Sequence, residues 1–363
     1  MDTKVKSGSP AATKTGIDRR RFLQQATTVG LSAAVLPATF SVGQAATNEV
    51  VVASWGGNYL EAQKAAFFDD FEKETGNRII IAEWDLSKLQ LMVESGNVEW
   101  DLITGIQGEQ ASVAQNNDFL EPIDFAVVPK ENLIEGSATD YYVAAEWYSA
   151  VIAWDAREFA QGPQSWADFW DVEKFPGPRA LGREALITLL GALLADGVEP
   201  GALIPIDYDR AFKSLDKIKP HVGVWYTSNG QPPQLLIDGQ VVMSSAYNAR
   251  IQGEMNKGAP LDYTWNQNIV NTGGYAVPRG AKNPEGAMQL IAWALDPKRQ
   301  AKFAAMIPYG VTTKEAFSYL DEAVAKTLPT APGNIEKAIP LDVKWLGENL
   351  DEMTRRLDEY ILK

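Results

Sequence analysis

Residues 49–104 decide the fold of this chain, and they read EVVVASWGGNYLEAQKAAFFDDFEKETGNRIIIAEWDLSKLQLMVESGNVEWDLIT. Short runs rich in Val and Ile alternate here with stretches of helical periodicity, and such runs are typical of buried parallel strands. We predict strands over residues 49–55, 78–81 and 101–104, and helices over residues 59–75 and 87–94. This β-α-β-α-β order predicts an α/β fold with an open, mostly parallel sheet and helices on both faces.

The carboxyl ends of these strands are the expected ligand-binding edge, because open α/β sheets bind ligands beyond those ends. One end is Trp55-Gly56-Gly57, where glycine lets the backbone approach a ligand closely. The other end is Thr104-Gly105-Ile106-Gln107, which we expect to lead into a loop over residues 105–109.

The remaining chain repeats the alternation and exceeds what one hydrophobic core usually holds, so we expect two lobes. Further strands are predicted over residues 150–154, 179–181, 222–225, 241–244 and 271–278. Further helices are predicted over residues 165–170, 185–194, 208–218, 231–238, 248–257 and 284–295. Residues 344–363 predict an amphipathic helix that packs on one lobe.

The first 45 residues have the pattern of a cleaved signal peptide. Asp18-Arg19-Arg20-Arg21-Phe22-Leu23 precedes a weakly apolar run over residues 26–40, and small residues close the segment near Ala45. The paired arginines before Phe-Leu favour the twin-arginine export route, and an ordinary secretory signal is the alternative. Export would place the mature protein in the periplasm.

Composition excludes several classes of function. Cleavage near Ala45 leaves a net charge of −18, which disfavours nucleic acid and anionic membranes as partners, and we expect no membrane insertion. The absence of cysteine and the single histidine, His221, exclude thiolate chemistry, cysteine-bound metals and multi-histidine metal sites. We therefore predict no cofactor, no metal and no catalytic residue.

Several motifs, in this order, resemble the periplasmic spermidine/putrescine-binding type of ABC-transporter receptor, an extracellular solute-binding family with the type II periplasmic binding fold. The motifs are Trp55 with Tyr59, Phe71–Gly76, Trp100-Asp101-Leu102, Ser165–Trp170, Tyr275–Pro278, Lys282–Ala287 and Ile307–Val311. None of them is specific alone, but the ordered set covers essentially the whole mature chain.

The resemblance implies a monomeric receptor with two α/β lobes that close around a small ligand and then dock onto permease subunits and their ATPase. It places chain crossings between the lobes near Trp147, Asn271 and Val311. The implied division is 1–45 for the signal peptide, 46–146 with 272–311 for lobe 1, and 147–271 with 312–363 for lobe 2. The chain has no phosphate-binding GxxxxGK[ST] motif, as expected when the ATPase is a separate chain.

Aromatic side chains at the predicted edge are the first candidates for ligand contact, because in polyamine receptors aromatics enclose the methylene chain and carboxylates pair with the ammonium groups. Trp55, Tyr59 and Tyr247 match aromatic positions of the family, and core packing is the alternative for each. We add Gln107 from the end of the third strand and Asn271, which stands where the family has a tryptophan.

Two departures from the polyamine pattern point to another ligand. Gly182-Arg183 replaces acids after one strand, and Gly273 stands where the family has a second acid. Arg183 and Arg250 suit a carboxylate, because a guanidinium binds both of its oxygens, although either could instead form a structural ion pair. We therefore expect an amino acid or another carboxylate, with Glu146 or Glu184 pairing any amine.

A polar loop over residues 226–231, including Ser228, precedes a predicted helix and suits an anionic or polar ligand, with simple helix capping as the alternative. Other functions remain open: a true putrescine/spermidine receptor, a sugar receptor, which the 11 tryptophans would suit, or a sensor for a membrane kinase. A cleft enzyme is a further alternative, but no nucleophile motif accompanies His221, so we predict that the protein is not an enzyme.

Overall fold

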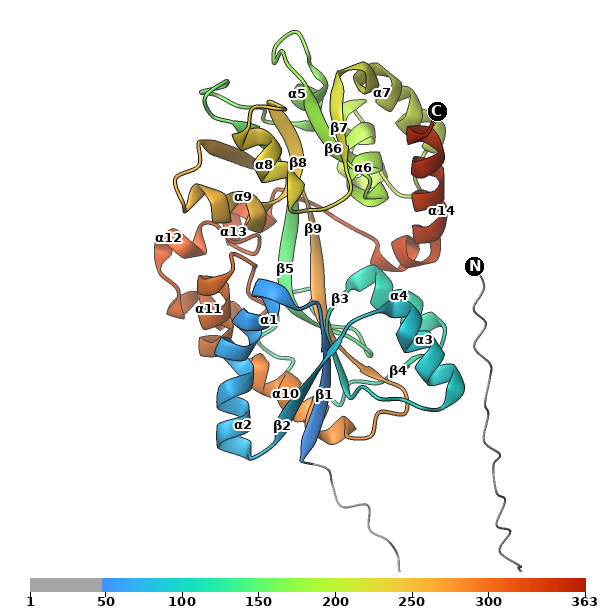
Figure 1. The fold of residues 1–363 in the computed structure, drawn as a ribbon, viewed down its shortest axis with the longest axis vertical. Coiled ribbons are helices and arrows are strands. Elements are labelled where there is room, and N and C mark those ends of the chain that lie inside the picture. The colour runs from blue at the N-terminus through green and yellow to red at the C-terminus, as the bar shows by residue number, and fades with distance from the viewer. Residues whose placement is uncertain (1–47) are drawn as a thin grey trace, which may run out of the picture. The chain divides into compact units, whose positions relative to one another are not determined.

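A computed structural model describes residues 48–363, and the predicted signal peptide with its twin-arginine motif lies outside them. The first lobe (Figure 1) begins with β1 (Glu49–Ser54), α1 (Gly57–Gln63), α2 (Asp69–Thr75), β2 (Arg78–Glu83), α3 (Leu86–Ser95), β3 (Leu102–Gln107) and α4 (Gly108–Asn116). Strand β1 pairs in parallel with both β2 and β3, as predicted. The loop expected over residues 105–109 is wrong: β3 continues to Gln107 and α4 starts at the next residue.

The predicted helix over residues 59–75 is one helical run interrupted by a π-helical turn, Lys64–Phe68. Its hydrophobic period was imperfect at Gln63 and Lys64, and the extra residue of the turn accounts for that. Gln63 is fully buried, where its amide accepts from Ser54 Oγ at 3.0 Å and donates to Thr104 Oγ1 at 2.5 Å. A polar residue interrupts the apolar face because it joins the ends of β1 and β3.

The second lobe contains α5 (Trp166–Trp170), β6 (Arg179–Gly182), α6 (Ala185–Ala195), α7 (Tyr208–Ile218), β7 (Val222–Tyr226), α8 (Gln231–Ile237), β8 (Met243–Tyr247) and α9 (Asn248–Met255). Strand β6 pairs in parallel with β7 and β8. These elements agree with the predicted ones to within three residues at either end. Helix α6 is apolar on all sides, because it lies inside the core of this lobe.

Two long strands, β5 (Val143–Asp155) and β9 (Leu261–Pro278), join the two parallel sets into one mixed sheet of order β2-β1-β3-β9-β5-β8-β6-β7. They pair with each other in antiparallel fashion along most of their length. Sequence analysis predicted only the second part of each strand. Ala144, Ala145 and Glu146 are poor strand formers, so the pairing with β9 determines their conformation.

The chain segments that contain the three predicted crossings lie side by side and are joined by backbone hydrogen bonds. Trp147 pairs with Thr272 of β9, and Tyr148 pairs with Asn271. Trp147 and Gly310 exchange backbone hydrogen bonds of 3.0 and 2.6 Å. Just beyond Gly310, Val311 and Leu328 form a small core with Ala304 of α11. The residue boundaries of the lobes remain predictions.

The rest of the chain supplies β4 (Leu120–Glu121), α10 (Pro284–Ala294), α11 (Pro297–Met306), α12 (Glu322–Ala325), α13 (Pro332–Ile335), β10 (Ala338–Ile339) and α14 (Val343–Ile361). Helix α11 was not predicted. Asp296 caps its first turn and Pro297 occupies its first position, and this pair is a recognised start signal.

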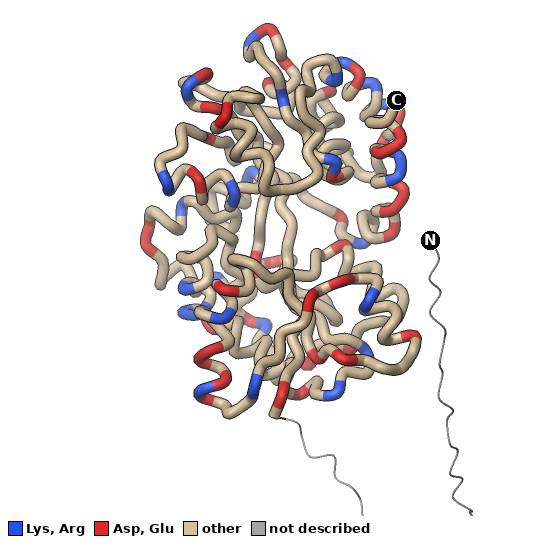
Figure 2. The backbone as a smooth tube through the Cα atoms, viewed as in Figure 1, with Lys and Arg blue, Asp and Glu red and all other residues tan. Residues whose placement is uncertain are grey.

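The expectation that the last helix packs on one lobe is wrong, because helix α14 contacts both lobes. Its apolar residues Leu346, Met353 and Leu357 lie in the core of the second lobe. Its first turns contact α4 of the first lobe, and Figure 1 shows the helix running from α4 up to α6 and α7. Figure 2 shows acidic and basic residues alternating along it, and Glu352 pairs with both Arg355 and Arg356.

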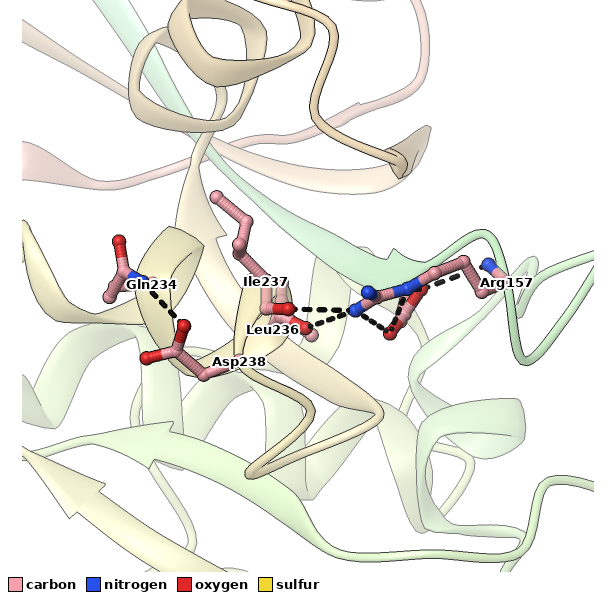
Figure 3. Close-up of polar contacts among 6 residues, drawn as sticks. Arg157, Gln234, Leu236, Ile237 and Asp238 are labelled. Atoms are coloured by element: carbon pink, nitrogen blue, oxygen red, sulfur yellow. Dashed lines mark hydrogen bonds and ion pairs between the residues drawn. The ribbon is translucent and has the colours of Figure 1, made fainter.

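The end of β5 is fixed to the second lobe by Arg157 (Figure 3). Its guanidinium pairs with Asp155 at 2.6 Å and donates to the carbonyl oxygens of Leu236 and Ile237 at 3.2 and 2.8 Å. These carbonyls end α8, where a cation is favourable because the carbonyl oxygens carry partial negative charge. The contact anchors the far end of β5 to α8.

Candidate functional site

A row of four tyrosine rings runs between the lobes. Tyr59 of α1 lies 6.3 Å, centroid to centroid, from Tyr309, which lies 6.3 Å from Tyr148 of β5. Tyr148 lies 5.2 Å from Tyr247 at the end of β8. All four rings are half-buried, so each can contact a ligand with one side. We call this set the tyrosine row; it has a carboxylate at each end.

The first end of the tyrosine row is Glu146 of β5, whose side chain is 3% exposed. The hydroxyl of Tyr59 donates to its two oxygens at 2.9 and 3.0 Å. Burial raises the pKa of Glu146 to about 8, and the hydrogen bond from Tyr59 opposes this rise. The carboxyl therefore holds its proton more readily than an exposed glutamate does.

Gly273 makes room for this carboxylate. It lies opposite Glu146 in the β5–β9 ladder, and residues opposite each other in a ladder share one face of the sheet. A methyl group placed on Gly273 would lie 2.1 Å from Glu146 Oε1. Gly273 carries no carboxylate, as expected, and Glu146 from the neighbouring strand fills the space beside it.

The second end of the tyrosine row is Glu184, the residue that precedes α6. The Tyr247 hydroxyl donates to its Oε1 at 2.5 Å. Burial raises the pKa of Glu184 to about 7. Hydrogen bonds from Tyr247 and Asn229 oppose this rise, and the negative charge of Glu109 adds to it. Glu184 is half-buried, so it is more accessible than Glu146.

A third acid, Glu109, was missed by sequence analysis. It lies in the first turn of α4, is 4% exposed, and accepts from Nδ2 of Asn271 at 3.3 and 3.1 Å. Burial raises its pKa, and hydrogen bonds from its own backbone and from Asn271 oppose that. An acid in the first helical turn after a predicted strand end was the available signal.

The other predicted residues of the first lobe lie beside this row. Trp55 is 55% exposed, and its indole Nε1 donates to the carbonyl oxygen of Gly105 at 2.8 Å, so the edge of the ring that carries Nε1 faces β3. Gln107 donates from Nε2 to the Tyr148 hydroxyl at 2.9 Å. Asn271 holds Glu109 rather than pointing to a free surface. The structure thus brings Trp55, Tyr59 and Gln107 to one edge.

The two arginines differ. Arg183 pairs with Asp358 of α14 at 2.7 Å, so its guanidinium is engaged in a structural ion pair. Arg250, in the first turn of α9, is exposed and makes no ion pair with any described residue. Burial and the charge of Glu146 raise the pKa of Tyr309, and the charge of Arg250 opposes that rise. Ser228 is exposed in its loop, where Gln231 caps the backbone; Asn229 is the loop residue that reaches Glu184.

The chemistry of the site is therefore that of three buried or half-buried acids, four phenols and one free guanidinium. Hydrogen bonds satisfy each acid, but no described basic side chain pairs with any of the three. Among residues 48–363, no group of three acids or histidines is arranged to hold a metal ion. Such a site can bind a cation against its carboxylates and an anion against Arg250.

Comparison with known proteins matches residues 66–332 to the family described as bacterial extracellular solute-binding protein. The chain belongs to this family of extracellular solute-binding proteins. This solute-binding protein is 35% identical to the gamma-aminobutyric acid-binding protein of Pseudomonas aeruginosa, over 88% of its own length and 93% of that protein. It is 26% identical to a spermidine/putrescine-binding periplasmic protein of Haemophilus influenzae, over 78% and 80% of the two chains.

The fold is shared with a solved ABC transporter substrate-binding protein from Bradyrhizobium japonicum, with a TM-score of 0.81 and 34% identity over 86% of this chain and 99% of that one. The predicted resemblance and the two-lobed fold are confirmed. The expected role as the substrate-binding component of an ABC importer, which works with permease and ATPase chains, is also confirmed. Within residues 48–363 no helix has the length and apolar character needed to cross a bilayer.

Proposed function

We propose that this solute-binding protein captures a small amino acid of the γ-aminobutyric acid type and delivers it to an ABC permease. The observation that carries the proposal is the tyrosine row, with the acids Glu146 and Glu184 at its ends and the free Arg250 beside it. The relative that is 35% identical, the gamma-aminobutyric acid-binding protein, supports it.

The ammonium group of the ligand pairs with Glu184 in this proposal. A cation that leaves water needs a counter-charge, and Glu184 is half-buried and therefore both accessible and shielded from solvent. Glu109 adds a second negative charge, since the two acids interact electrostatically. The faces of Tyr148 and Tyr247 add cation–π attraction of about 0.5–2 kcal/mol.

The carboxylate of the ligand pairs with Arg250. The guanidinium is unengaged, and its fork binds both carboxylate oxygens. Tyr309, in the middle of the tyrosine row, supplies a hydroxyl that can donate to the same carboxylate. The methylene carbons then lie along the rings between the two charged groups.

Ligand contacts come from both lobes, and this would favour closure, because only contacts made better in the closed state shift the equilibrium toward it. Tyr59 and Gln107 belong to the first lobe, and Glu184, Tyr247 and Arg250 to the second. We further propose that the protein acts in the periplasm as a monomer after export by the twin-arginine signal, and that it has no catalytic activity.

Calorimetric titration with ligands of equal chain length tests the proposal. γ-Aminobutyric acid, putrescine, butyrate and succinate share four carbons and differ only in their end groups. We expect binding of γ-aminobutyric acid at least about 100-fold tighter than of the other three, because each of them lacks one matching charge or adds a wrong one. Equal or weaker binding of γ-aminobutyric acid would overturn the proposal.

A diamine such as putrescine is the second candidate, because the tyrosine row has an acid at both of its ends. Two ammonium groups would then pair with Glu146 and Glu184, and Arg250 would repel the ligand. Preferred binding of putrescine, further improved when Arg250 is replaced by alanine, would establish this candidate in place of the first.

A further inference from the structure

Helix α14 is fixed to the second lobe by its C-terminal half. Leu357 and Met353 lie in the core of that lobe, and Asp358 pairs with Arg183 at 2.7 Å. Tyr360 donates from its hydroxyl to Asp216 at 2.9 Å and its carbonyl oxygen accepts from Lys219 at 3.0 Å. These contacts tie α14 to α6 and α7, so the helix moves with the second lobe.

The N-terminal turns of α14 also touch the first lobe, and they do so at a glycine. A methyl group placed on Gly347 would lie 2.9 Å from the carbonyl oxygen of Glu109 and 2.9 Å from Cβ of Ser112. The backbones of α14 and α4 thus approach as closely as a glycine allows. Neither alanine nor any larger residue fits unless one helix shifts.

The residue that Gly347 touches belongs to the proposed site. Glu109 is one of the three acids, and Asn271 of β9 donates a hydrogen bond to its carboxylate. The neighbouring Gly108 is equally enclosed: a methyl group there would lie 3.3 Å from Oγ1 of Thr272 and 3.6 Å from Val343 of α14. Helix α4 therefore lies between the crossing strand β9 and the last helix.

We propose that α14 is a further connection between the lobes, in addition to the three crossings, and that Gly347 is a positioning residue which sets the place of Glu109 and the angle between the lobes. When the lobes rotate about β5 and β9, α14 must pivot on α4 at Gly347, because its other end is fixed. The last helix thereby links the site acid of the first lobe to Arg183 and Glu184 of the second.

The test replaces Gly347 by alanine and compares the variant with a matched control, Gly253→Ala. Gly253 lies in α9, and no atom lies within 4 Å of a methyl group placed there. Both changes add one methyl group to a helix, but only Gly347→Ala meets α4. The absence of cysteine allows spin labels at Leu91→Cys on α3 and Lys257→Cys after α9, both exposed positions on opposite lobes.

We expect Gly347→Ala to change the distance distribution between the labels in ligand-free protein, whereas Gly253→Ala leaves it as in the parent. The label distances are measured without ligand, so they test the connection between the lobes even if the proposed function is wrong. Only the role of Glu109 as a site acid rests on the proposed function. We also expect γ-aminobutyric acid to bind about fivefold more weakly or worse to Gly347→Ala, with the control unchanged.

A compensating variant keeps the inference falsifiable if Gly347→Ala folds poorly. Ser112→Gly removes one of the two close contacts, so the double variant should recover part of both the label distances and the affinity. A purely structural role would lower the melting temperature while leaving the distances and the affinity of the folded protein unchanged. That outcome, or identical label distances in all variants, would overturn the inference.

Discussion

The two ends of the tyrosine row have the same chemistry in different surroundings. Glu146 lies in the central strand β5, is 3% exposed, and is held between Tyr59 and the bare backbone of Gly273. Glu184 lies at the start of a helix, is half-buried, and accepts hydrogen bonds from Tyr247 and from the loop residue Asn229. Burial alone therefore does not make a carboxylate a binding residue, because the ligand must also be able to reach it.

Replacing Glu184 by glutamine should have the largest effect. The change removes the proposed counter-charge of the ammonium group and keeps the shape of the side chain, so affinity for γ-aminobutyric acid should fall by about 2–3 kcal/mol, roughly 30–150-fold. Glu146→Gln, the matched change at the other end, should lower affinity by less than about tenfold, because this carboxyl is enclosed and holds its proton. Calorimetric titration of both variants measures the difference.

Equal losses of affinity in the two variants would contradict the distinction between the ends and favour a ligand with a cation at each end. Tyr247→Phe is a useful control, because it removes the hydroxyl that donates to Glu184 without removing the charge. A loss intermediate between the parent and Glu184→Gln is expected.

Sequence analysis predicted the outer parts of the molecule better than its centre. The short strands and helices of both lobes follow from local patterns of Val, Ile and turn residues, and Gly76 and Gly96 end their helices in the left-handed conformation. The first halves of β5 and β9 were missed because their conformation depends on pairing with strands more than 100 residues away.

The site residues also separate into those that local sequence patterns predict and those that depend on distant contacts. Trp55, Tyr59 and Gln107 follow strand ends and were found from the local pattern, whereas the fit of Glu146 into the space at Gly273 depends on the register of two distant strands. Arg183 and Arg250 look alike in sequence. Only the position of Asp358, 175 residues along the chain from Arg183, separates them.

Gly273→Ala tests the enclosed end with the next largest effect. The added methyl group would displace the Glu146 carboxylate, and overpacking of this kind typically costs about 1–3 kcal/mol of unfolding free energy. We expect a lower melting temperature, measured by calorimetry. The double variant Gly273→Ala with Glu146→Ala removes the conflict, so it should melt higher than Gly273→Ala alone; if it melts lower, the two residues do not compete for one space.

The two arginines allow a matched comparison of smaller size. Arg250→Ala should weaken binding of γ-aminobutyric acid by about 1.5 kcal/mol, or roughly tenfold, because a charge-assisted hydrogen bond to the carboxylate is lost. Arg183→Ala breaks a half-exposed ion pair, which is worth at most about 1 kcal/mol of stability, and should leave affinity within about threefold. The opposite ranking, measured by titration, would place the ligand carboxylate at Arg183.

The smallest expected effect is a pH dependence in which stability and affinity have opposite slopes. The pKa values of Glu146 and Glu184 lie at about 8 and about 7 in the folded protein, above the ordinary 4.5, so the folded state binds more protons than the unfolded state between these limits. The free energy of unfolding of ligand-free protein should therefore fall as pH rises from 5 to 8, and the melting temperature should fall with it. Affinity for an ammonium ligand should instead rise, because Glu184 becomes charged. Glu146→Gln should weaken the pH dependence of stability and leave the pH dependence of affinity unchanged. If this variant weakens both, the two ends of the tyrosine row have the same role.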